Sequence, residues 1–226
     1  MFKLASGASS ANVHLVRDER RARKLIRGMF SRSGMIPMVY VPPGAGPGER
    51  VLREARNFAL RCLAAPLYVF LKRYPPLPRE FWAPEKNYAL FQEYIGGNAF
   101  DTRITVIGDR AFGFRRMNRA GDFRASGSGN IDADPSKIDE RCVRSALDYS
   151  RRIAAQSVAF DFLFREESRE PVATEISYGF ADWAVQQCPG HWDSGLRWWE
   201  GRMWPQEAHI VDFLRRIESR KASGAA

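Results

Sequence analysis

The stretch Ser157-Val-Ala-Phe-Asp-Phe-Leu-Phe164 is apolar at almost every position, and Asp161 interrupts it in the middle. A nearly continuous apolar run of this length is typical of a strand that is covered on both faces. A second run, Val172-Ala-Thr-Glu-Ile-Ser177, follows after the polar loop at 165–170. We predict two strands, over 157–164 and 171–177, that pair across this short loop. Because side chains alternate along a strand, Glu175 and Ser177 should share one face.

A carboxylate at position 161 needs a partner, because an unpaired buried carboxylate costs several kcal/mol or loses its charge. If the two strands pair, Asp161 and Glu175 approach each other. At about 4 Å they would repel by roughly 4 kcal/mol at an effective dielectric constant of about 20. A magnesium ion, which prefers carboxylates, waters and phosphate oxygens, would turn this repulsion into binding. An arginine that forms a structural ion pair with Asp161 is the alternative that the spacing leaves open.

The rest of the chain alternates helical and extended patterns, which predicts the α+β class. Periodicity predicts helices, and Ser136 is the expected N-cap of the helix at 137–155. Pro205 is expected to open the last helix. We divide the chain into two parts, 1–87 and 88–226. The expected helices lie at 18–30, 49–73, 137–155 and from 205, and the further strands at 11–16, 88–95, 102–107 and 111–117, the last two joined by a turn at Gly108-Asp109.

Composition and charge restrict the class of protein. The sequence contains no run of about 18 apolar residues, so no membrane span is predicted. The N-terminus also lacks the apolar core of a secretory signal. Three isolated cysteines fit a reducing cytoplasm. Residues 1–61 hold twelve Lys/Arg against four Asp/Glu, so a basic protein that binds polyanions stays an alternative. Aromatic residues do not alternate with these charges, which argues against single-stranded nucleic acid.

Two segments suggest phosphate recognition. Six arginines and no lysine fall within 103–124, and guanidinium groups match phosphate and carboxylate oxygens with two parallel hydrogen bonds. Alternation sends Arg115 and Arg116 to opposite faces, so they cannot both serve one site. Lys3 precedes a loop of small residues at 5–12, and the backbone N–H groups of such loops close on phosphates. A solvent-exposed hairpin and an unstructured terminus are the respective alternatives.

Five of the six tryptophans lie at 183, 192, 198, 199 and 204. They would either line the pocket of an acceptor substrate or cover the core beneath a C-terminal helix. Cys188 and His191 lie close enough in sequence to suggest a nucleophile and its base, but no third residue that would orient them is evident.

In their order along the chain, these segments resemble the ATP-grasp superfamily, in the branch of glutathione synthetase-like and ribosomal-protein glutamate ligases. Lys3 and the Ser/Gly-rich loop resemble the family's strand lysine and phosphate-covering loop. Phe91-Gln-Glu-Tyr-Ile95 resembles its hinge strand, and Asp101-Thr-Arg103 the motif after the hinge. Arg115-Arg116 and Gly121-Asp-Phe-Arg124 resemble its arginine-bearing hairpin, and Phe160-Asp161 with Glu175-Ile-Ser177 its metal ligands. The likeness spans about residues 1–180.

This resemblance implies an ATP-grasp fold, in which two α+β subdomains clasp ATP, and a ligase that activates a carboxylate as an acylphosphate for attack by an amine or a thiol. It implies ATP and Mg²⁺ or Mn²⁺ as cofactors, a carboxylate donor with a small-molecule or peptide acceptor as substrates, and a homo-oligomer as one possible state. Three groups of residues follow. The expected nucleotide ligands are Lys3, Ser6, Gly7, Ser9, Ser10, Gln92, Glu93, Tyr94, Ile95, Asp101 and Arg103; the catalytic arginines are Arg115, Arg116 and Arg124; and the metal ligands are Asp161, Glu175 and Ser177.

The sequence departs from the family pattern at two points. Ser177 stands where the family usually has asparagine, although a hydroxyl oxygen also suits magnesium. Family members carry a preceding α/β domain, so we expect the 226-residue chain to be a truncated member. Both departures keep a non-catalytic nucleotide-binding remnant open as an alternative to an active ligase.

Overall fold

The computed structural model describes residues 1–4, 13–35, 84–118 and 130–222. Contacts divide the chain into two units, Met1–Tyr94 and Ile95–Ala226. This division falls a few residues after the one predicted at 87/88 and cuts through the expected hinge segment. The predicted helix at 49–73 lies outside the described residues.

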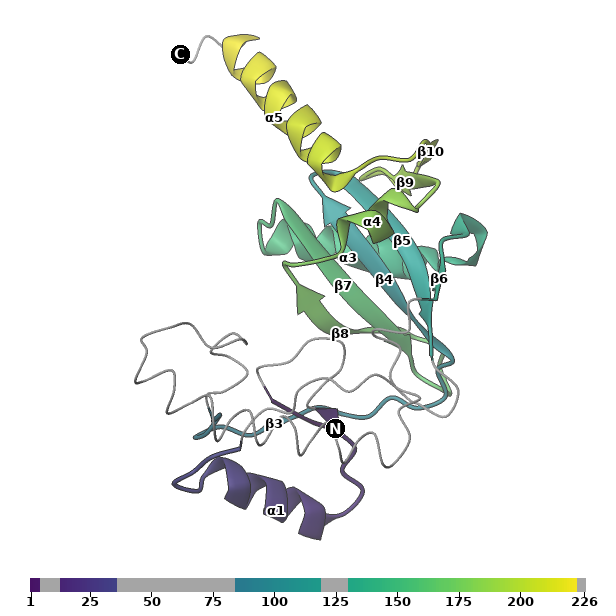
Figure 1. Cartoon of the computed structure of the whole chain (residues 1–226). Helices are drawn as coiled ribbons and strands as arrows, with labels where there is room; N and C mark the ends of the chain where they lie inside the picture. Colours follow the sequence, from purple (N-terminus) through teal and green to yellow (C-terminus); the bar gives the residue numbers. More distant parts are fainter. Residues whose placement is uncertain (5–12, 36–83, 119–129, 223–226) are drawn as a thin grey trace. The chain divides into compact units, whose positions relative to one another are not determined.

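The described residues of the first unit form a small antiparallel sheet and one helix (Figure 1). Its central strand β1, Phe2–Lys3, pairs with β2, Val13–His14, and with β3, Leu90–Phe91. Helix α1, Glu19–Met29, confirms the helical periodicity, and Asp18 caps its N-terminus by accepting a hydrogen bond from the N–H of Arg21 at 2.7 Å. The core of this unit lies between sheet and helix and consists of Phe2, Leu4, Leu25 and Met29.

The expected strand over 88–95 is mostly wrong, because only Leu90–Phe91 forms a strand among these residues. Both backbone groups of Gln92 nevertheless bond to Met1: the N–H of Gln92 donates to the Met1 carbonyl at 2.8 Å, and the Met1 ammonium donates to the Gln92 carbonyl at 2.6 Å. These two bonds tie the segment to β1 beyond the regular pairing.

A seven-stranded sheet forms the second unit, in the order β10-β9-β5-β4-β7-β8, with β6 paired to β5. All its neighbouring strands are antiparallel. The pairs predicted at 102–107 with 111–117 and at 157–164 with 171–177 are confirmed. The strands are β4 Phe100–Ile107, β5 Arg110–Met117, β6 Ile131–Asp132, β7 Ser157–Phe164, β8 Pro171–Ser177, β9 Gly190–Trp192 and β10 Trp198–Glu200.

Three α-helices accompany this sheet: α3 Glu140–Arg152, α4 Asp182–Gln186 and α5 Pro205–Ala222, with a 3-10 turn, η2, at Pro135–Lys137. Pro205 opens α5 as predicted. The predicted N-cap Ser136 is wrong: Ser136 lies in η2, and Asp139 caps α3 by accepting from the N–H of Arg141 at 2.9 Å. Asp139 is the better placed acceptor because the chain turns into the helix only after η2.

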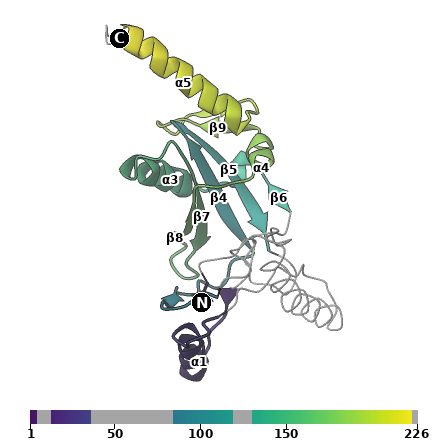
Figure 2. The same ribbon diagram turned by 60° about the vertical axis from the view of Figure 1, so that its left-hand side comes forward.

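The two faces of the sheet are covered by different elements. Figure 2 shows α3 on one side of the sheet and α4 on the other. Under α3 lies a core that includes Ile104, Phe160 and Phe162, whereas Phe112 and Phe114 pack with α4. Strand alternation places Asp161 on the α4 side, away from its phenylalanine neighbours. Asp101, Arg103 and Arg116 lie on this second face as well.

Candidate functional site

Two carboxylates and two arginines form a connected network on the second face of the sheet. Asp101 lies opposite Arg116 in the β4–β5 pair, and Arg103 lies opposite Asp161 in the β4–β7 pair. Three neighbouring strands therefore bring all four side chains to one surface. We call Asp101, Arg103, Arg116, Asp161 and the adjacent Glu175 the acid–arginine cluster.

Asp161 accepts three hydrogen bonds from these arginines. Its Oδ1 accepts from Arg103 Nε at 2.6 Å, and its Oδ2 accepts from Arg103 Nη2 at 2.8 Å and from Arg116 Nη2 at 2.6 Å. Arg116 also binds Asp101 with two hydrogen bonds, at 2.7 Å and 2.5 Å. Two-pronged guanidinium–carboxylate pairs of this kind fix orientation as well as charge. The alternative of a structural ion pair at Asp161 is thus observed.

Burial and the neighbouring charges have opposite effects on the pKa of Asp161, which is only 4% exposed. Burial raises its pKa, but the Arg103 hydrogen bond and the charges of Arg116 and Arg103 outweigh burial and hold the pKa below its ordinary value. Burial raises the pKa of Asp101 above its ordinary value, because its single partner, Arg116, offsets burial only in part. Burial also lowers the pKa of Arg116, but the hydrogen bonds and negative charges of Asp101 and Asp161 together outweigh burial and raise the pKa overall. Asp161 is therefore the more firmly ionised of the two acids.

Glu175 lies directly opposite Asp161 in the β7–β8 pair, as the predicted strand pairing requires. It is exposed, whereas Asp161 is buried, so the two carboxylates lead from the sheet interior to its surface. A register shift follows between Asp161 and Phe162. The hydroxyl of Thr174, next to Glu175, donates to the Asp161 carbonyl at 3.1 Å. This bond fixes the strand at the irregularity.

Ser177, the third expected metal ligand, lies opposite Ala159, two residues along the same face. Its hydroxyl donates to the Gly179 carbonyl at 2.8 Å, and its oxygen keeps acceptor capacity. Among the described residues, no three acidic, histidine or cysteine side chains are arranged to hold a metal ion. A metal at this position would therefore bind through two protein carboxylates and take its other ligands elsewhere.

This two-carboxylate arrangement fits magnesium. Magnesium usually keeps several waters and binds through one or two carboxylates together with substrate phosphates. A carboxylate has about four lone-pair sites, and arginines use three of those on Asp161, so one acceptor direction remains. Glu175 supplies the second carboxylate from the exposed side.

A buried hydroxyl belongs to the same face but was not singled out in the sequence. Thr105 is completely buried in β4, two residues after Arg103, and its Oγ1 has no hydrogen-bond partner in the part of the chain that the structure describes. A threonine within a strand is common for its shape alone, so the sequence carried no signal for it.

Of the two remaining expected arginines, only one is described. Arg115 is on the opposite face from Asp161, as alternation requires: its guanidinium lies 4.2 Å from the centre of the Phe100 ring and donates to the Lys137 carbonyl. Arg115 therefore does not join the acid–arginine cluster, whereas Arg116 does. Arg124 lies outside the described residues.

The expected nucleotide ligands divide between the two units. Asp101 and Arg103 belong to the acid–arginine cluster in the second unit. Lys3, Gln92, Glu93 and Tyr94 lie in the first unit, and Ile95 begins the second. The loop residues Ser6, Gly7, Ser9 and Ser10 lie outside the described residues.

Cys188 and His191 do not form a nucleophile–base pair. The Cys188 thiol donates to the carbonyls of Gly113 at 3.5 Å and Ala184 at 3.7 Å, and the residue is 1% exposed. Burial raises its pKa to about 12. Burial, followed by the nearby charge of Arg110, lowers the pKa of His191. A buried neutral thiol and a neutral imidazole are typical of structural roles.

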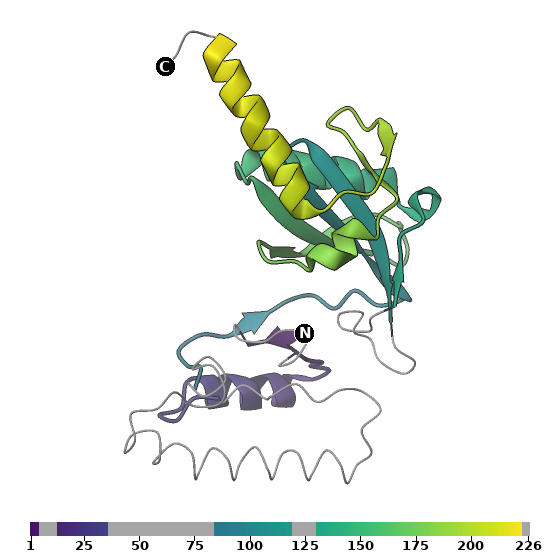
Figure 3. The same ribbon diagram turned by 45° about the horizontal axis from the view of Figure 1, so that its top comes forward.

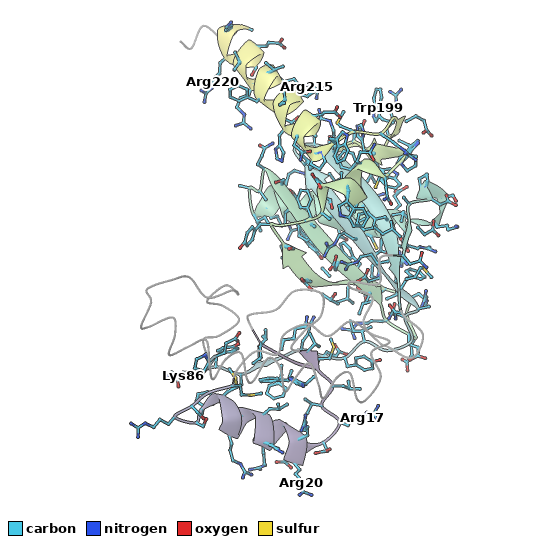
Figure 4. The ribbon with its side chains drawn as sticks, in the orientation of Figure 1. Arg17, Arg20, Lys86, Trp199, Arg215 and Arg220 are labelled. Carbon is cyan, nitrogen blue, oxygen red and sulfur yellow. The ribbon has the colours of Figure 1, made fainter. Side chains whose placement is uncertain are left out.

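The described tryptophans differ in burial. Trp192 is buried and packs edge-on against Trp198, with ring centres 4.7 Å apart. Trp199 is 45% exposed, carries the Arg197 guanidinium 4.4 Å above its ring, and is labelled in Figure 4 near β9 and β10. Trp192 is therefore part of the core, whereas the acceptor pocket stays a prediction for the other tryptophans.

The second unit, an antiparallel sheet with α3 over one face and α4 over part of the other, has a mixed α+β fold. A family model described as the RimK-like ATP-grasp domain matches residues 64–178, which is just over half of the chain. The chain therefore belongs to the RimK-like ATP-grasp family, as the resemblance to ribosomal-protein glutamate ligases predicted. No curated protein matches the chain. No described helix is long and apolar enough to cross a membrane.

Proposed function

We propose that the protein is an ATP-dependent ligase that binds Mg²⁺–ATP at the acid–arginine cluster and activates a carboxylate as an acylphosphate. The observation that carries this proposal is the cross-strand pair of Asp161 and Glu175, with Arg103 and Arg116 beside it. Membership of the RimK-like ATP-grasp family supports the general class of ATP-dependent ligases.

Magnesium, when bound, supplies the positive charge that neutralises the phosphates and orients them. Asp161, which its lowered pKa keeps ionised, and the exposed Glu175 are the residues that would hold the metal. Ser177 is the candidate for a third oxygen ligand. Mn²⁺ would suit the same oxygens.

Arg103 and Arg116 are proposed to serve two partners in turn. Without nucleotide they satisfy Asp161 and Asp101, whose buried charges would otherwise be costly. Phosphate oxygens accept from guanidinium groups in the same two-pronged geometry. Part of the arginine hydrogen bonding therefore passes from the acids to the phosphates, which frees lone pairs on Asp161 for the metal.

In the proposed reaction, an oxygen of the substrate carboxylate attacks the γ-phosphorus of ATP, the bond to the β,γ-bridging oxygen breaks, and ADP leaves. An amine nitrogen then attacks the acyl carbon, phosphate leaves, and the amide forms after the nitrogen loses a proton. A thiol would give a thioester by the same steps. Such phosphoryl transfer needs mainly positioning of the reactants and stabilisation of charge. In the proposed reaction, Arg103 and Arg116 supply both.

The proposed partners are ATP, a carboxylate donor and an amine acceptor that is a small molecule or a peptide, in the cytoplasm. Lys3, the segment at 92–95 and the loop at 5–12 stay proposed nucleotide ligands on the strength of the sequence. Nucleic acid is not proposed as a partner, although basic residues such as Arg17 and Arg20 line the beginning of α1 (Figure 4).

The test uses the full chain, with two readouts. Isothermal titration with Mg²⁺–ADP measures binding without turnover, and ADP release measures activity with mixtures of candidate carboxylates and amines. We expect Asp161→Asn and Glu175→Gln each to weaken Mg²⁺-dependent binding by at least about tenfold. Glu167→Gln, which removes an exposed carboxylate from the β7–β8 turn, is the matched control and should bind like wild type.

Binding that ignores both cluster substitutions, or that ignores removal of Mg²⁺ by a chelator, would overturn the proposed site. Binding that depends on both residues without ADP release for any substrate mixture would instead favour the second candidate, a non-catalytic nucleotide-binding protein. The three arginine hydrogen bonds on Asp161, which leave only one acceptor direction for a metal, are the structural observation that favours this candidate.

A further inference from the structure

Helix α5 is held to the second unit by one of its faces. Ala208 is completely buried there, and Asp212 accepts from the buried Arg110 at 2.5 Å and from Gln156 at 3.3 Å. Arg216 donates to the Gln156 side chain at 2.9 Å. Residues 208, 212 and 216 recur every four positions and so mark one stripe along the helix. This stripe is the anchored face.

The opposite face of α5 is apolar and exposed. Ile210, Phe213 and Leu214 are 59%, 60% and 52% exposed, and Ile217 is partly exposed. These four positions follow the i, i+3, i+4, i+7 spacing of one helix face. Asp212 is two residues from both Ile210 and Leu214, and two residues along an α-helix are separated by a rotation of about 200°. The apolar stripe therefore points away from the anchored face. Figure 3 shows α5 projecting from the sheet.

This pattern is the reverse of an ordinary surface helix, which turns its large apolar side chains towards its own domain. Here the domain side is held by a small alanine and an ion pair, and the large side chains face outward. A contiguous exposed apolar stripe of this kind is characteristic of an interaction surface.

We infer that this apolar stripe of α5 pairs with the same stripe of a second copy of the chain, in an antiparallel arrangement. The stripe is symmetric about the point between Phe213 and Leu214. An antiparallel pair centred there places Ile210 level with Ile217 of the other copy, and Phe213 level with its Leu214. The interface is then made twice by one surface, as two-fold symmetry requires.

Charge supports the antiparallel direction. Glu207 lies in the first turn and Lys221 in the last turn, on the same flank of the stripe. The antiparallel pair brings each Glu207 close to the Lys221 of the other copy, whereas a parallel pair would place like charges together. Figure 4 shows that the outer part of the helix also carries Arg215 and Arg220. Direct pairing of these basic ends is avoided only when the helices run in opposite directions.

The experiment measures the mass of the full chain in solution by light scattering and by sedimentation over a dilution series. We expect a dimer at micromolar concentration and at least about a hundredfold weaker association for Phe213→Glu, since central interface positions dominate binding. Ile153→Glu is the matched control, because Ile153 is 52% exposed, close to the 60% of Phe213, but lies beyond α3. It should leave the dimer intact.

A charge exchange tests the direction of the pair. Glu207→Lys and Lys221→Glu alone should each weaken the dimer, and the double variant should restore it. A chain that stays monomeric at all concentrations, or a dimer that tolerates Phe213→Glu, overturns the inference. Monomers whose stripe binds vesicles of anionic lipid, with loss of binding in Phe213→Glu, would also overturn it and would assign the surface to membranes. Circular dichroism shows whether each variant is folded.

Discussion

Asp161 and Glu175 face each other directly across β7 and β8, yet Asp161 is 4% exposed and Glu175 is exposed. Two like charges at such a position are stable because two guanidinium groups balance the inner one. The difference in burial means that the two acids contribute differently to folding, although we propose the same ligand for both.

Asp161→Asn should destabilise the protein much more than Glu175→Gln. The first substitution removes the carboxylate that pairs with Arg103, whereas Arg116 keeps Asp101, and so leaves one uncompensated charge in a buried network, at a cost of roughly 3–5 kcal/mol. The second removes an exposed carboxylate and should change the free energy of unfolding by less than about 0.5 kcal/mol. Denaturation by urea, monitored by circular dichroism, measures both. Equal effects of the two substitutions would contradict the ion-pair network described here.

The stabilisation by Asp161 should depend on pH. Its folded-state pKa lies below the ordinary value of 3.8, so its contribution is complete above that value and is lost as the pH falls through the folded pKa. The raised pKa of Asp101 acts in the opposite direction, but Asp101 is present in both proteins that are compared. The difference in unfolding free energy between wild type and Asp161→Asn should therefore shrink below about pH 4. A difference that stays constant down to about pH 2 would contradict the ionised state of Asp161.

Gly108→Ala should destabilise the second unit. Gly108 has φ +61°, a region that other residues rarely adopt, and an added methyl group would meet the Asp212 carboxylate that holds α5 to Arg110. Strain and displacement of Asp212 together should cost roughly 1–3 kcal/mol. Thermal unfolding measures the loss. Gly179→Ala is the control, because nothing lies within 4 Å of its added methyl group. Equal melting temperatures for the two variants would contradict the role of Gly108.

Cys142 and Cys188 should resist alkylation in the folded protein. Both are buried, and burial raises the pKa of each thiol to about 12, so roughly one thiol in ten thousand is ionised at pH 8. Iodoacetamide treatment followed by peptide mass spectrometry should find both unmodified before denaturation and modified after it. Rapid labelling of Cys188 in the folded state would restore the idea of a reactive thiol beside His191.

The local patterns of the sequence were sufficient for β4, β5, β7 and β8 and for the pairing of the two acids. The run at 157–164 and the run at 171–177 became β7 and β8 with the predicted bounds, because alternation and a short loop act between near neighbours. The same rule separated Arg115 from Arg116. Asp139, rather than Ser136, became the cap of α3, because an unforeseen 3-10 turn moved the start of the helix.

The partners of Asp161 required the tertiary structure. Arg103 and Asp161 are 58 residues apart in the chain, and they meet only because β4 pairs with β7 after α3 has crossed the other face. The sequence left a metal and an arginine as equal alternatives because hydrogen bonding between distant strands has no local signature. The outward direction of the apolar stripe on α5 was also hidden, since periodicity identifies a helix face but only packing decides what that face meets.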